Sequence, residues 1–505
     1  MIGGLQKYRL KAAAACLIAG AVLPLAFAPF DIALLGVLAP AVLFYFLADA
    51  KPGDAFLYGY AFGLGMFGTG VNWLHISINL FGGISLSGAY LLTYLLVAYL
   101  ALYPALAGYL CRKYWRCSAA VLLVVALPAM WTLAEWCRSW FLTGFPWLNL
   151  GYSQTDTPLS GVSPLAGVYG ASWLACLSAA LLVCLLRRDV SRKFAVVLAL
   201  VLVWAGGGIL KAVPWTAHAS RSLSVALIQG AIPQQIKWDP EQQQNTLELY
   251  LALSEPHWGK DLIIWPETAI PMLYHDAEPF IGMLDMLGKQ HGTALLTGVP
   301  IKDRERIRYY NSLIMVGDGS GVYNKRHLVP FGEYLPLDKW LRPLLDYLRI
   351  PMSRFSAGAA TQPLLRPGGV AAGVSICYED VFGEEIITAL PEAGMLINIS
   401  NDAWFGDSIA PHQHLQMARM RALETGRYLL RGTNTGITAI IDEKGGVIGR
   451  SPQFAPYALA GDARVYTGTT PYVRFGNYPA VLLASALLLF CLPVIRRSDR
   501  ARPAD

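Results

Sequence analysis

One short stretch of the chain reads Val374-Ser375-Ile376-Cys377-Tyr378-Glu379-Asp380. Small and β-branched residues lead into a cysteine, and polar and acidic residues follow it. This pattern is typical of a buried strand that ends in a polar turn, and we expect a helix behind the turn at Val381–Leu390. Backbone N–H groups and a helix N-terminus favour a thiolate and an oxyanion, so a cysteine there is well placed to be a nucleophile.

Similar apolar, β-branched runs recur between residues 220 and 475. They are Leu223–Gln229, Asp261–Trp265, Ala294–Val299, Ser312–Gly317, Val374–Tyr378, Met395–Ser400 and Gly436–Asp442. Helical stretches such as Glu241–Ser254 and His414–Arg427 separate several of them. Alternating strands and helices predict a layered α/β domain. Turn sequences at Gly317–Gly321 and Glu443–Gly446 predict hairpins, and therefore mixed sheets.

The rest of the chain has a different composition. The 505 residues are 55% hydrophobic and 15% charged, which excludes a disordered chain, a collagen-like repeat and an ordinary soluble enzyme. Residues 1–211 hold only 13 of the 40 Lys and Arg and 6 of the 34 Asp and Glu. The net charge of +6 comes without a dense basic cluster, so nucleic-acid binding is not expected. We expect a membrane-embedded part followed by a water-soluble block.

A membrane-spanning helix needs about 20 mostly apolar residues. Eight stretches approach this requirement, and the second of them is short: Ala12–Ala28, Ile32–Leu47, Ala55–Leu74, Leu91–Leu110, Ala119–Leu133, Gly167–Leu186, Phe194–Ile209 and Tyr478–Ile495. The sequence thus predicts a seven-helix membrane domain at 1–215, a catalytic domain at 220–475, an eighth span at 476–497 and a cytoplasmic tail at 498–505. The glycines of the third span (Gly63, Gly65, Gly68 and Gly70) suit close helix packing.

Loop charges predict the orientation of these spans. Lys and Arg concentrate in one set of loops and at both ends of the chain, while the other set of short loops contains little more than Arg138 and Lys211. Both termini are therefore predicted to be cytoplasmic and the 220–475 block to be exported, which in a bacterium means the periplasm. Ala26-Phe27-Ala28 resembles a signal-peptide cleavage site, but Pro29 follows it, so we expect the first span to be retained.

Three separate residues are candidates for chemistry in the exported block. Cys377 is its only cysteine, and it is either a nucleophile or a small buried hydrophobe. Glu267 follows an apolar run in Trp265-Pro266-Glu267, where it is either a base or a helix N-cap. Lys325 lies in a charged run before Leu328-Val329-Pro330-Phe331-Gly332-Glu333, where it is either a solvated charge or part of a structured loop. A carboxylate, a cation and a thiol together suit acyl transfer.

These motifs resemble the Glu–Lys–Cys motifs of the nitrilase, or carbon–nitrogen hydrolase, superfamily. With the spans, Gly144-Phe145-Pro146-Trp147-Leu148, Gly151-Tyr152-Ser153-Gln154 and Ser400-Asn401-Asp402-Ala403-Trp404-Phe405-Gly406, nearly the whole chain resembles the apolipoprotein N-acyltransferase family of the bacterial inner membrane.

The resemblance implies a layered α-β-β-α sandwich for the exported domain and a function for the chain. A fatty acyl chain would move from a phospholipid, typically phosphatidylethanolamine, to Cys377. It would then pass to the N-terminal amine of a diacylglyceryl-cysteine apolipoprotein. Glu267 would be the base and Lys325 would support the oxyanion. No metal or other cofactor is implied. The resemblance also gives supporting positions: Trp238, Glu333, Tyr378, Glu379 and Trp404.

Weaker signals remain. An apolar stripe at helical spacing over Leu337–Leu348, interrupted by Pro343, predicts either a core helix or an interfacial lid. His412 and His414 alternate, but without a third ligand nearby they do not predict a metal site. Glu135 lies near the end of a span, where it can reach the interface.

Two other functions are compatible with parts of the sequence. A membrane-anchored amidase would use the same triad with water as the acceptor, although an anchor needs one span and not eight. A transporter with an exported domain would carry polar residues in its spans and internal repeats, and few are visible. An acyl-enzyme on Cys377 separates the enzymes from the transporter.

Overall fold

The computed structural model describes residues 2–115, 117–188, 190–303, 305, 308–336 and 355–499. The predicted stripe at Leu337–Leu348 lies outside these residues. The chain forms two compact units. The first unit comprises Met1–His75, Leu86–Val213 and Arg474–Asp505, and the second comprises Ile76–Ser85 and Pro214–Val473.

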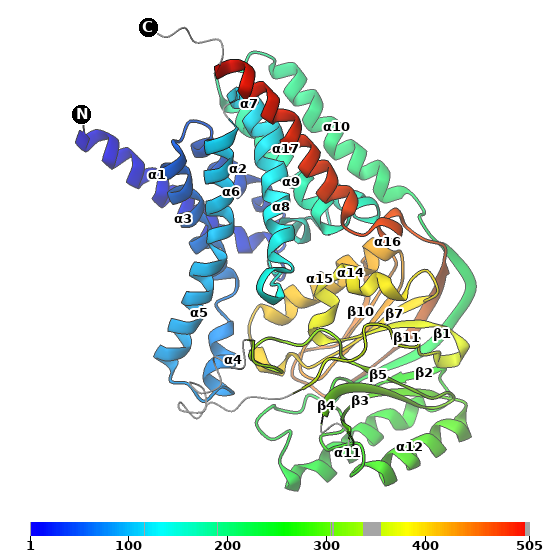
Figure 1. Cartoon of the computed structure of the whole chain (residues 1–505). Coiled ribbons are helices and arrows are strands. Elements are labelled where there is room, and N and C mark those ends of the chain that lie inside the picture. Colours follow the sequence, from blue (N-terminus) through cyan, green and yellow to red (C-terminus); the bar gives the residue numbers. More distant parts are fainter. Residues whose placement is uncertain are drawn as a thin grey trace. The chain divides into compact units, whose positions relative to one another are not determined.

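The first unit is built from helices (Figure 1). The longer ones are α1 (Ile2–Val22), α2 (Leu35–Leu47), α3 (Pro52–Gly70), α5 (Leu86–Leu100), α6 (Leu102–Tyr114), α8 (Leu127–Arg138), α9 (Ser163–Leu186), α10 (Lys193–Ala212) and α17 (Tyr478–Asp499). Within the described residues, five helical segments are long and apolar enough to cross a membrane: Gln6–Ala26, Leu86–Tyr114, Ala119–Arg138, Pro158–Leu186 and Lys193–Ala212. Leu35–Leu47 and Tyr478–Cys491 are shorter apolar helices, so the count of eight spans stays a prediction.

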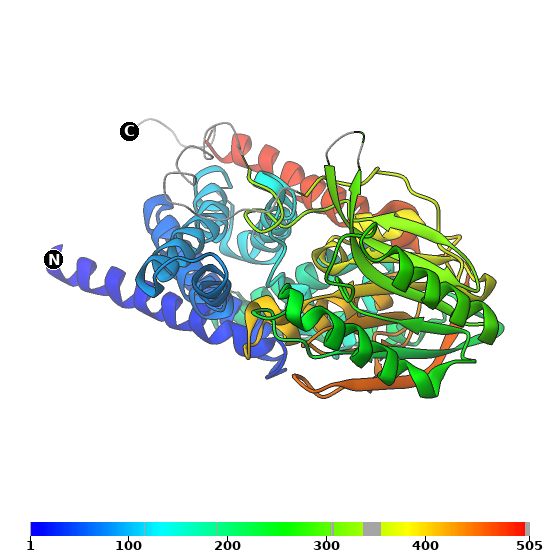
Figure 2. The same ribbon diagram turned by 90° about the horizontal axis from the view of Figure 1, so that it is seen from below.

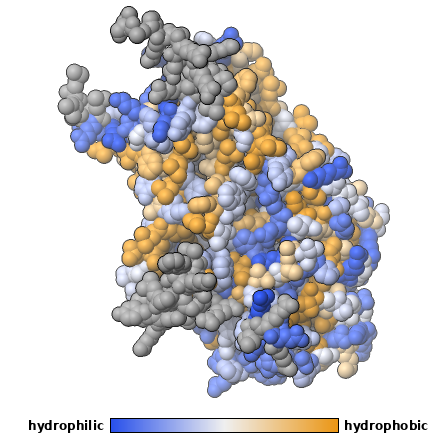
Figure 3. All heavy atoms as spheres, in the orientation of Figure 1, coloured by the Kyte–Doolittle hydropathy of each residue, from blue (hydrophilic) through white to orange (hydrophobic). Residues whose placement is uncertain are grey.

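The outer surface of these helices is apolar. Figure 3 shows hydrophobic residues gathered over the helices of the first unit on the face drawn. α10 illustrates this, because Phe194, Leu202 and Ile209 are all more than half exposed. Exposed apolar side chains on a long helix suit contact with lipid rather than with water.

The glycines of α3 allow its neighbours to approach closely, as predicted. A Cβ on Gly65 would lie 2.1 Å from the Leu17 carbonyl oxygen of α1, and a Cβ on Gly63 would lie 2.6 Å from the Ala101 Cα, just before α6. Any larger residue at these positions would push the helices apart.

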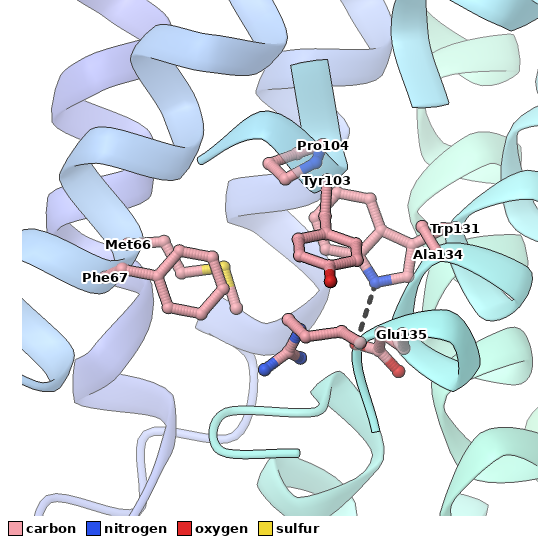
Figure 4. A pocket seen from close by; sticks show the side chains of 8 residues that line it. Met66, Phe67, Tyr103, Pro104, Trp131, Ala134 and Glu135 are labelled. Carbon is pink, nitrogen blue, oxygen red and sulfur yellow. Dashed lines mark hydrogen bonds between the residues drawn. The ribbon is translucent and has the colours of Figure 1, made fainter. Parts of the chain in front are cut away.

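Two charged residues of α8 are buried in the first unit. Arg138 donates to the carbonyl oxygens of Phe145 and Trp147 at 2.7 and 2.5 Å, and Glu135 Oε1 accepts from the Leu150 N–H at 2.7 Å. Glu135 also accepts from the Trp131 indole at 2.9 Å, beside a small cavity (Figure 4). That cavity is lined by Met66, Phe67, Tyr103, Pro104, Trp131, Ala134, Glu135 and Arg138. Glu135 therefore does not reach an interface; with Arg138 it fixes the loop that follows α8.

The second unit contains two mixed sheets. The first has the order β11-β1-β2-β3-β4-β5 and the second has the order β10-β9-β8-β7-β6. The strands of the first are β1 (Ala217–Gln229), β2 (Leu262–Ile264), β3 (Ala294–Asp303), β4 (Arg308–Gly317), β5 (Gly321–Asn324) and β11 (Tyr457–Thr467). Those of the second are β6 (Ala372–Ile376), β7 (Met395–Ser400), β8 (Leu429–Thr433), β9 (Ala439–Ile441) and β10 (Val447–Arg450). Both predicted hairpins are present, between β4 and β5 and between β9 and β10.

The sheets pack face to face and helices cover their outer faces. One buried core joins residues of both sheets, such as Leu227, Ile264 and Ile397. Other faces pack against α11 (Pro240–Ser254) with α12 (Glu278–His291), and against α15 (Ala410–Thr425) with α14 (Gly383–Ile386). Figures 1 and 2 show α11 and α12 on the outer side of the first sheet. The result is the predicted α-β-β-α order of layers. β2, β5 and β6 end just before Glu267, Lys325 and Cys377, respectively.

One local prediction was wrong. Val381–Leu390 is not a single helix but α14 flanked by the 3-10 turns Cys377–Val381 (η8) and Ile387–Ala389. The break occurs at Phe382, whose backbone is extended at φ −101° and ψ 90°. This conformation lets the Phe382 ring stack on His327 with a centroid distance of 3.7 Å. A long helix dipole therefore does not point at Cys377.

Candidate active site

Cys377 stands at the end of β6 in a strained backbone conformation. Its φ is +52°, in the left-handed region that side chains other than glycine rarely adopt. The turn is held by Glu379, whose Oε2 accepts from the Ile376 N–H at 2.7 Å, and by Asn398, whose Nδ2 donates to the Cys377 carbonyl at 3.3 Å. Strain of this kind persists only where the surroundings enforce it, and it is common at functional sites.

Glu267 follows β2 in a tightly packed turn. The Pro266 carbonyl accepts from the Gly298 N–H of β3 at 3.2 Å, and a Cβ at Gly298 would lie 2.3 Å from the Thr268 nitrogen. Only glycine therefore fits at 298. Glu267 is 7% exposed, and its Oε1 accepts from Asn311 Nδ2 at 2.6 Å.

Lys325 follows β5 and is 1% exposed. Its Nζ lies 2.8 Å from Glu333 Oε2 and 3.8 Å from Glu267 Oε1. Asn311 of β4 joins the two acids, because its Nδ2 also donates to Glu333 Oε1 at 2.8 Å. These four residues, Glu267, Asn311, Lys325 and Glu333, are called the triad cluster below.

The charges of this cluster act on the cysteine. Burial raises the pKa of the Cys377 thiol, Glu267 raises it further, and Lys325 opposes them, so the thiol is neutral at rest. Burial disfavours the charge on Lys325, but Glu333 and then Glu267 outweigh it and raise the Lys325 pKa. The site thus holds a neutral thiol and a permanent ammonium beside carboxylates, one of which can accept the thiol proton.

Glu379 is structural in its contacts. It is fully buried, and its Oε1 accepts from the Arg326 N–H at 2.6 Å, the His327 N–H at 3.2 Å and the Tyr323 hydroxyl at 3.0 Å. Burial raises the Glu379 pKa, although the backbone donors counteract this. Glu379 thereby ties the Lys325 loop to the cysteine turn. Tyr378 packs edge-on against Phe382 at 5.1 Å.

The two predicted tryptophans are partly exposed. Trp238 is 48% exposed in the turn after β1, and Trp404 is 39% exposed in the 3-10 turn Asp402–Phe405 (η10). Phe81 packs edge-on against Trp404 with ring centroids 4.9 Å apart. Phe81 belongs to Ile76–Ser85, a segment of the second unit that lies between two helices of the first in sequence. Among the described residues, neither tryptophan takes part in the hydrogen bonds and ion pairs that surround Glu267, Lys325 and Cys377.

Three polar features near the site were not predicted. Asn311 directly precedes the predicted apolar run Ser312–Gly317. Its polar side chain at that position was the only feature of the sequence that could have identified it. Lys237 is 2% exposed and its Nζ donates to the Glu267 carbonyl at 3.1 Å. Burial, opposed by Glu267, lowers the Lys237 pKa to about 8. A buried charged cluster around His414 is described below; its members lie up to 51 residues apart in sequence, so spacing gave no signal.

Comparison with known proteins agrees with this geometry. Residues 224–466 match the sequence profile described as carbon-nitrogen hydrolase, which defines the class of the second unit. Residues 19–181 match the profile described as apolipoprotein N-acyltransferase N-terminal domain.

Curated relatives that align with nearly the whole chain are also named apolipoprotein N-acyltransferase. The chain is 47% identical to the apolipoprotein N-acyltransferase of Methylococcus capsulatus over 98% of this chain and 99% of the relative. It is 46% identical to that of Azotobacter vinelandii over 96% of each chain, and 43% identical to that of Pseudomonas aeruginosa over 94% of each. The chain belongs to the apolipoprotein N-acyltransferase family.

Proposed function

We propose that this chain transfers a fatty acyl chain from a phospholipid, through a thioester on Cys377, to the N-terminal amine of a diacylglyceryl-cysteine apolipoprotein. The observation that supports this most directly is a strained cysteine at a strand end whose pKa responds to both Glu267 and Lys325. Membership of the apolipoprotein N-acyltransferase family supplies the class of acceptor.

In the first half-reaction Cys377 is acylated. Glu267 accepts the thiol proton while Sγ attacks the ester carbonyl carbon of the phospholipid. Lys325 stabilises the oxyanion that forms, which is usually a large contribution to catalysis. The new C–S bond persists, the ester C–O bond breaks, and Glu267 returns the proton to the leaving oxygen, which releases a lysophospholipid.

In the second half-reaction the acyl chain moves to the acceptor. The α-amine of the lipoprotein cysteine attacks the thioester carbonyl, a C–N bond forms and the C–S bond breaks. Glu267 accepts one amine proton and returns it to Sγ, so the enzyme is regenerated. The supporting residues have separate tasks: Glu333 and Glu379 fix the Lys325 loop, Tyr378 packs beside the nucleophile, and Trp238 and Trp404 offer apolar surface to lipid.

The donor and the topology belong to the same proposal. Phosphatidylethanolamine, with its sn-1 chain, is the expected donor. The chain would lie in the bacterial inner membrane with eight spans, and both termini would be cytoplasmic. The 220–475 domain, which in the sequence follows the helices of 1–215 and precedes the span at 476–497, would be periplasmic. The bias of Lys and Arg toward one set of loops supports this orientation.

Intact-mass spectrometry tests the chemistry. We expect purified protein incubated with phosphatidylethanolamine to gain one fatty-acyl mass, and Cys377→Ala to gain none. Cys137→Ala is the matched control, since Cys137 is also partly buried. An adduct that survives in Cys377→Ala would contradict the proposal.

Adding an acceptor identifies the second half-reaction. A diacylglyceryl-cysteine peptide with a free α-amine should remove the adduct and gain its mass, whereas the N-acetylated peptide should not. Release of free fatty acid without acylated peptide would instead support the amidase.

A further inference from the structure

A second group of buried polar residues is connected to Cys377 by hydrogen bonds. It comprises Asp380 of η8, Asn398 of β7, Asp402 of η10, His414 of α15 and Arg431 of β8, and each is at most 3% exposed. We call these five residues the histidine cluster. They come from five different elements of the second unit, and the proposed acyl-transfer steps use none of them.

The cluster is held together by the Arg431 guanidinium. Its Nη1 donates to Asp380 Oδ2 at 2.8 Å and its Nη2 donates to Asp402 Oδ2 at 3.1 Å. His414 bridges the same two acids, with Nε2 2.8 Å from Asp380 Oδ1 and Nδ1 3.0 Å from Asp402 Oδ1. Both ring nitrogens of His414 are therefore engaged by protein groups, and Arg431 Nη2 also lies 2.8 Å from His414 Nδ1.

Asn398 connects this cluster to the nucleophile. Arg431 Nη1 donates to Asn398 Oδ1 at 2.6 Å. The amide oxygen must therefore face the guanidinium, and the amide Nδ2 must face the other way. That Nδ2 donates to the Cys377 carbonyl at 3.3 Å and to the Ser375 hydroxyl at 3.0 Å. The orientation of one amide thus depends on a charged group that does not touch Cys377.

A second connection runs through Ser400. Its hydroxyl donates to Asp402 Oδ1 at 3.0 Å, and the Ser400 side chain also lowers the pKa of the Cys377 thiol. The cluster therefore reaches both the carbonyl and the sulfur of the same residue. The carbonyl belongs to the peptide that joins Cys377 to Tyr378, so fixing it also fixes the direction of the Tyr378 N–H.

We infer that the histidine cluster is a positioning device, in which Arg431, held by Asp380, Asp402 and His414, orients Asn398 so that Cys377 stays in its left-handed conformation. This inference rests on the proposed role of Cys377 as the nucleophile. The cluster residues do not touch substrate; they act through the Cys377 peptide. Reaction rates are sensitive to displacements of about 1 Å at the reacting atoms, so losing this support should lower the rate of acylation more than donor binding.

The test measures thioester formation in single turnovers with the full-length protein in detergent and phosphatidylethanolamine as the donor. Asn398→Asp keeps the shape and the oxygen that accepts from Arg431, but it replaces the donor to the Cys377 carbonyl with a second acceptor. We expect its maximal acylation rate to fall about 10- to 100-fold, with the half-saturating donor concentration changed less than about threefold.

His414→Gln is the second variant, because it weakens the bridge between the acids without touching Asn398. We expect a smaller loss of rate in the same parameter, about five- to tenfold. Glu424→Gln is the matched control. Glu424 is fully buried and pairs with Arg421 at 3.1 Å on the same helix, about 15 Å along α15 from His414. It should lower the unfolding temperature without lowering the acylation rate.

Three results would overturn the inference. One is an Asn398→Asp rate within about threefold of wild type. Another is a loss in Glu424→Gln equal to that in His414→Gln at the same loss of stability. The third is a failure of both cluster variants to fold at 20 °C, because a cluster needed for folding as a whole is not a positioning device. Cys377→Ala is assayed in parallel: an adduct there would refute the nucleophile itself, which separates that failure from this one.

Discussion

The triad cluster and the histidine cluster bury opposite charges beside the same cysteine, but they do so in different ways. In the triad cluster a single ammonium, Lys325, serves two carboxylates and lies closer to Glu333 than to Glu267, at 2.8 against 3.8 Å. In the histidine cluster a planar guanidinium and an imidazole bridge both acids at 2.8–3.1 Å.

The difference suits two separate roles for the buried charges around Cys377: taking part in the reaction and holding the geometry of the site. Lys325 Nζ lies 1 Å farther from Glu267 than from Glu333, which suits the proposed role of Glu267 as the base. The acids of the histidine cluster are saturated by fixed donors and are suited to hold geometry. Charge that reacts and charge that supports can therefore be told apart by variants that remove one charge at a time.

The largest effect is expected at Glu267. Glu267→Gln keeps the shape and can still accept from Asn311, but it cannot take the thiol proton. General-base catalysis contributes about 10²- to 10⁴-fold, so thioester formation should slow by that factor while the unfolding temperature stays within a few degrees of wild type. Quenched time courses of the acyl-enzyme mass measure the rate. Glu278→Gln, an exposed acid at the start of α12, is the control. A Glu267→Gln rate within tenfold of wild type would contradict the assignment of the base.

Replacing Lys325 should lower both the stability and the activity of the protein. Lys325→Met leaves two buried carboxylates without their cation, which typically costs about 3–5 kcal/mol of unfolding free energy. The double variant Lys325→Met/Glu333→Gln removes one of those acids, so it should recover part of the stability but none of the activity. Denaturant unfolding in detergent and the acyl-enzyme assay provide the two measurements.

An exposed ion pair gives the reference for Lys325. Lys289 pairs with Asp285 at 2.6 Å and its side chain is 65% exposed. Lys289→Met should therefore change stability by less than about 1 kcal/mol and leave acylation unchanged. Full recovery of activity in the double variant would show that Lys325 only balances Glu333, and would remove its role at the oxyanion.

The sequence predicted the elements of the triad cluster better than its connections. Glu267 and Cys377 follow apolar runs that composition and alternation mark as strands, whereas the short strand before Lys325, β5, was not among the predicted runs. The family motifs then supplied Glu333 and Glu379. Asn311 was missed because its importance comes from facing Glu267 across 44 residues of sequence, and no local pattern encodes such a contact.

The remaining differences have the same origin in tertiary contacts. The expected helix at Val381–Leu390 is interrupted because Phe382 stacks on His327, which outweighs local helix propensity. The segment Ile76–Ser85 belongs to the second unit through contacts such as Phe81 with Trp404, although the sequence places it between apolar helices. The histidine cluster combines residues that each look like ordinary polar positions in a loop, a strand or a helix.

The smallest expected effect is the pH dependence of stability, and it distinguishes the two clusters by sign. Burial and Arg431 oppose a charge on His414, but Asp380 and Asp402 outweigh them and raise its pKa from 6.5 to about 8. The folded state therefore binds this proton more tightly than the unfolded state. Its contribution is complete below about pH 6.5 and is lost as the pH rises through 8, a decrease of about 2 kcal/mol, or roughly 5 °C in unfolding temperature.

Lys237, beside the triad cluster, should act in the opposite direction. Its folded-state pKa is lowered from 10.5 to about 8, so the unfolded state binds the proton more tightly and stability rises as the pH increases from 8 toward 10.5. Unfolding temperatures measured from pH 6 to 10 should therefore fall and then recover. His414→Gln should flatten the first part of the curve and Lys237→Met the second. If both variants keep the wild-type curve, neither buried charge is linked to folding. The contrast between the clusters would then rest only on the acylation rates of their variants.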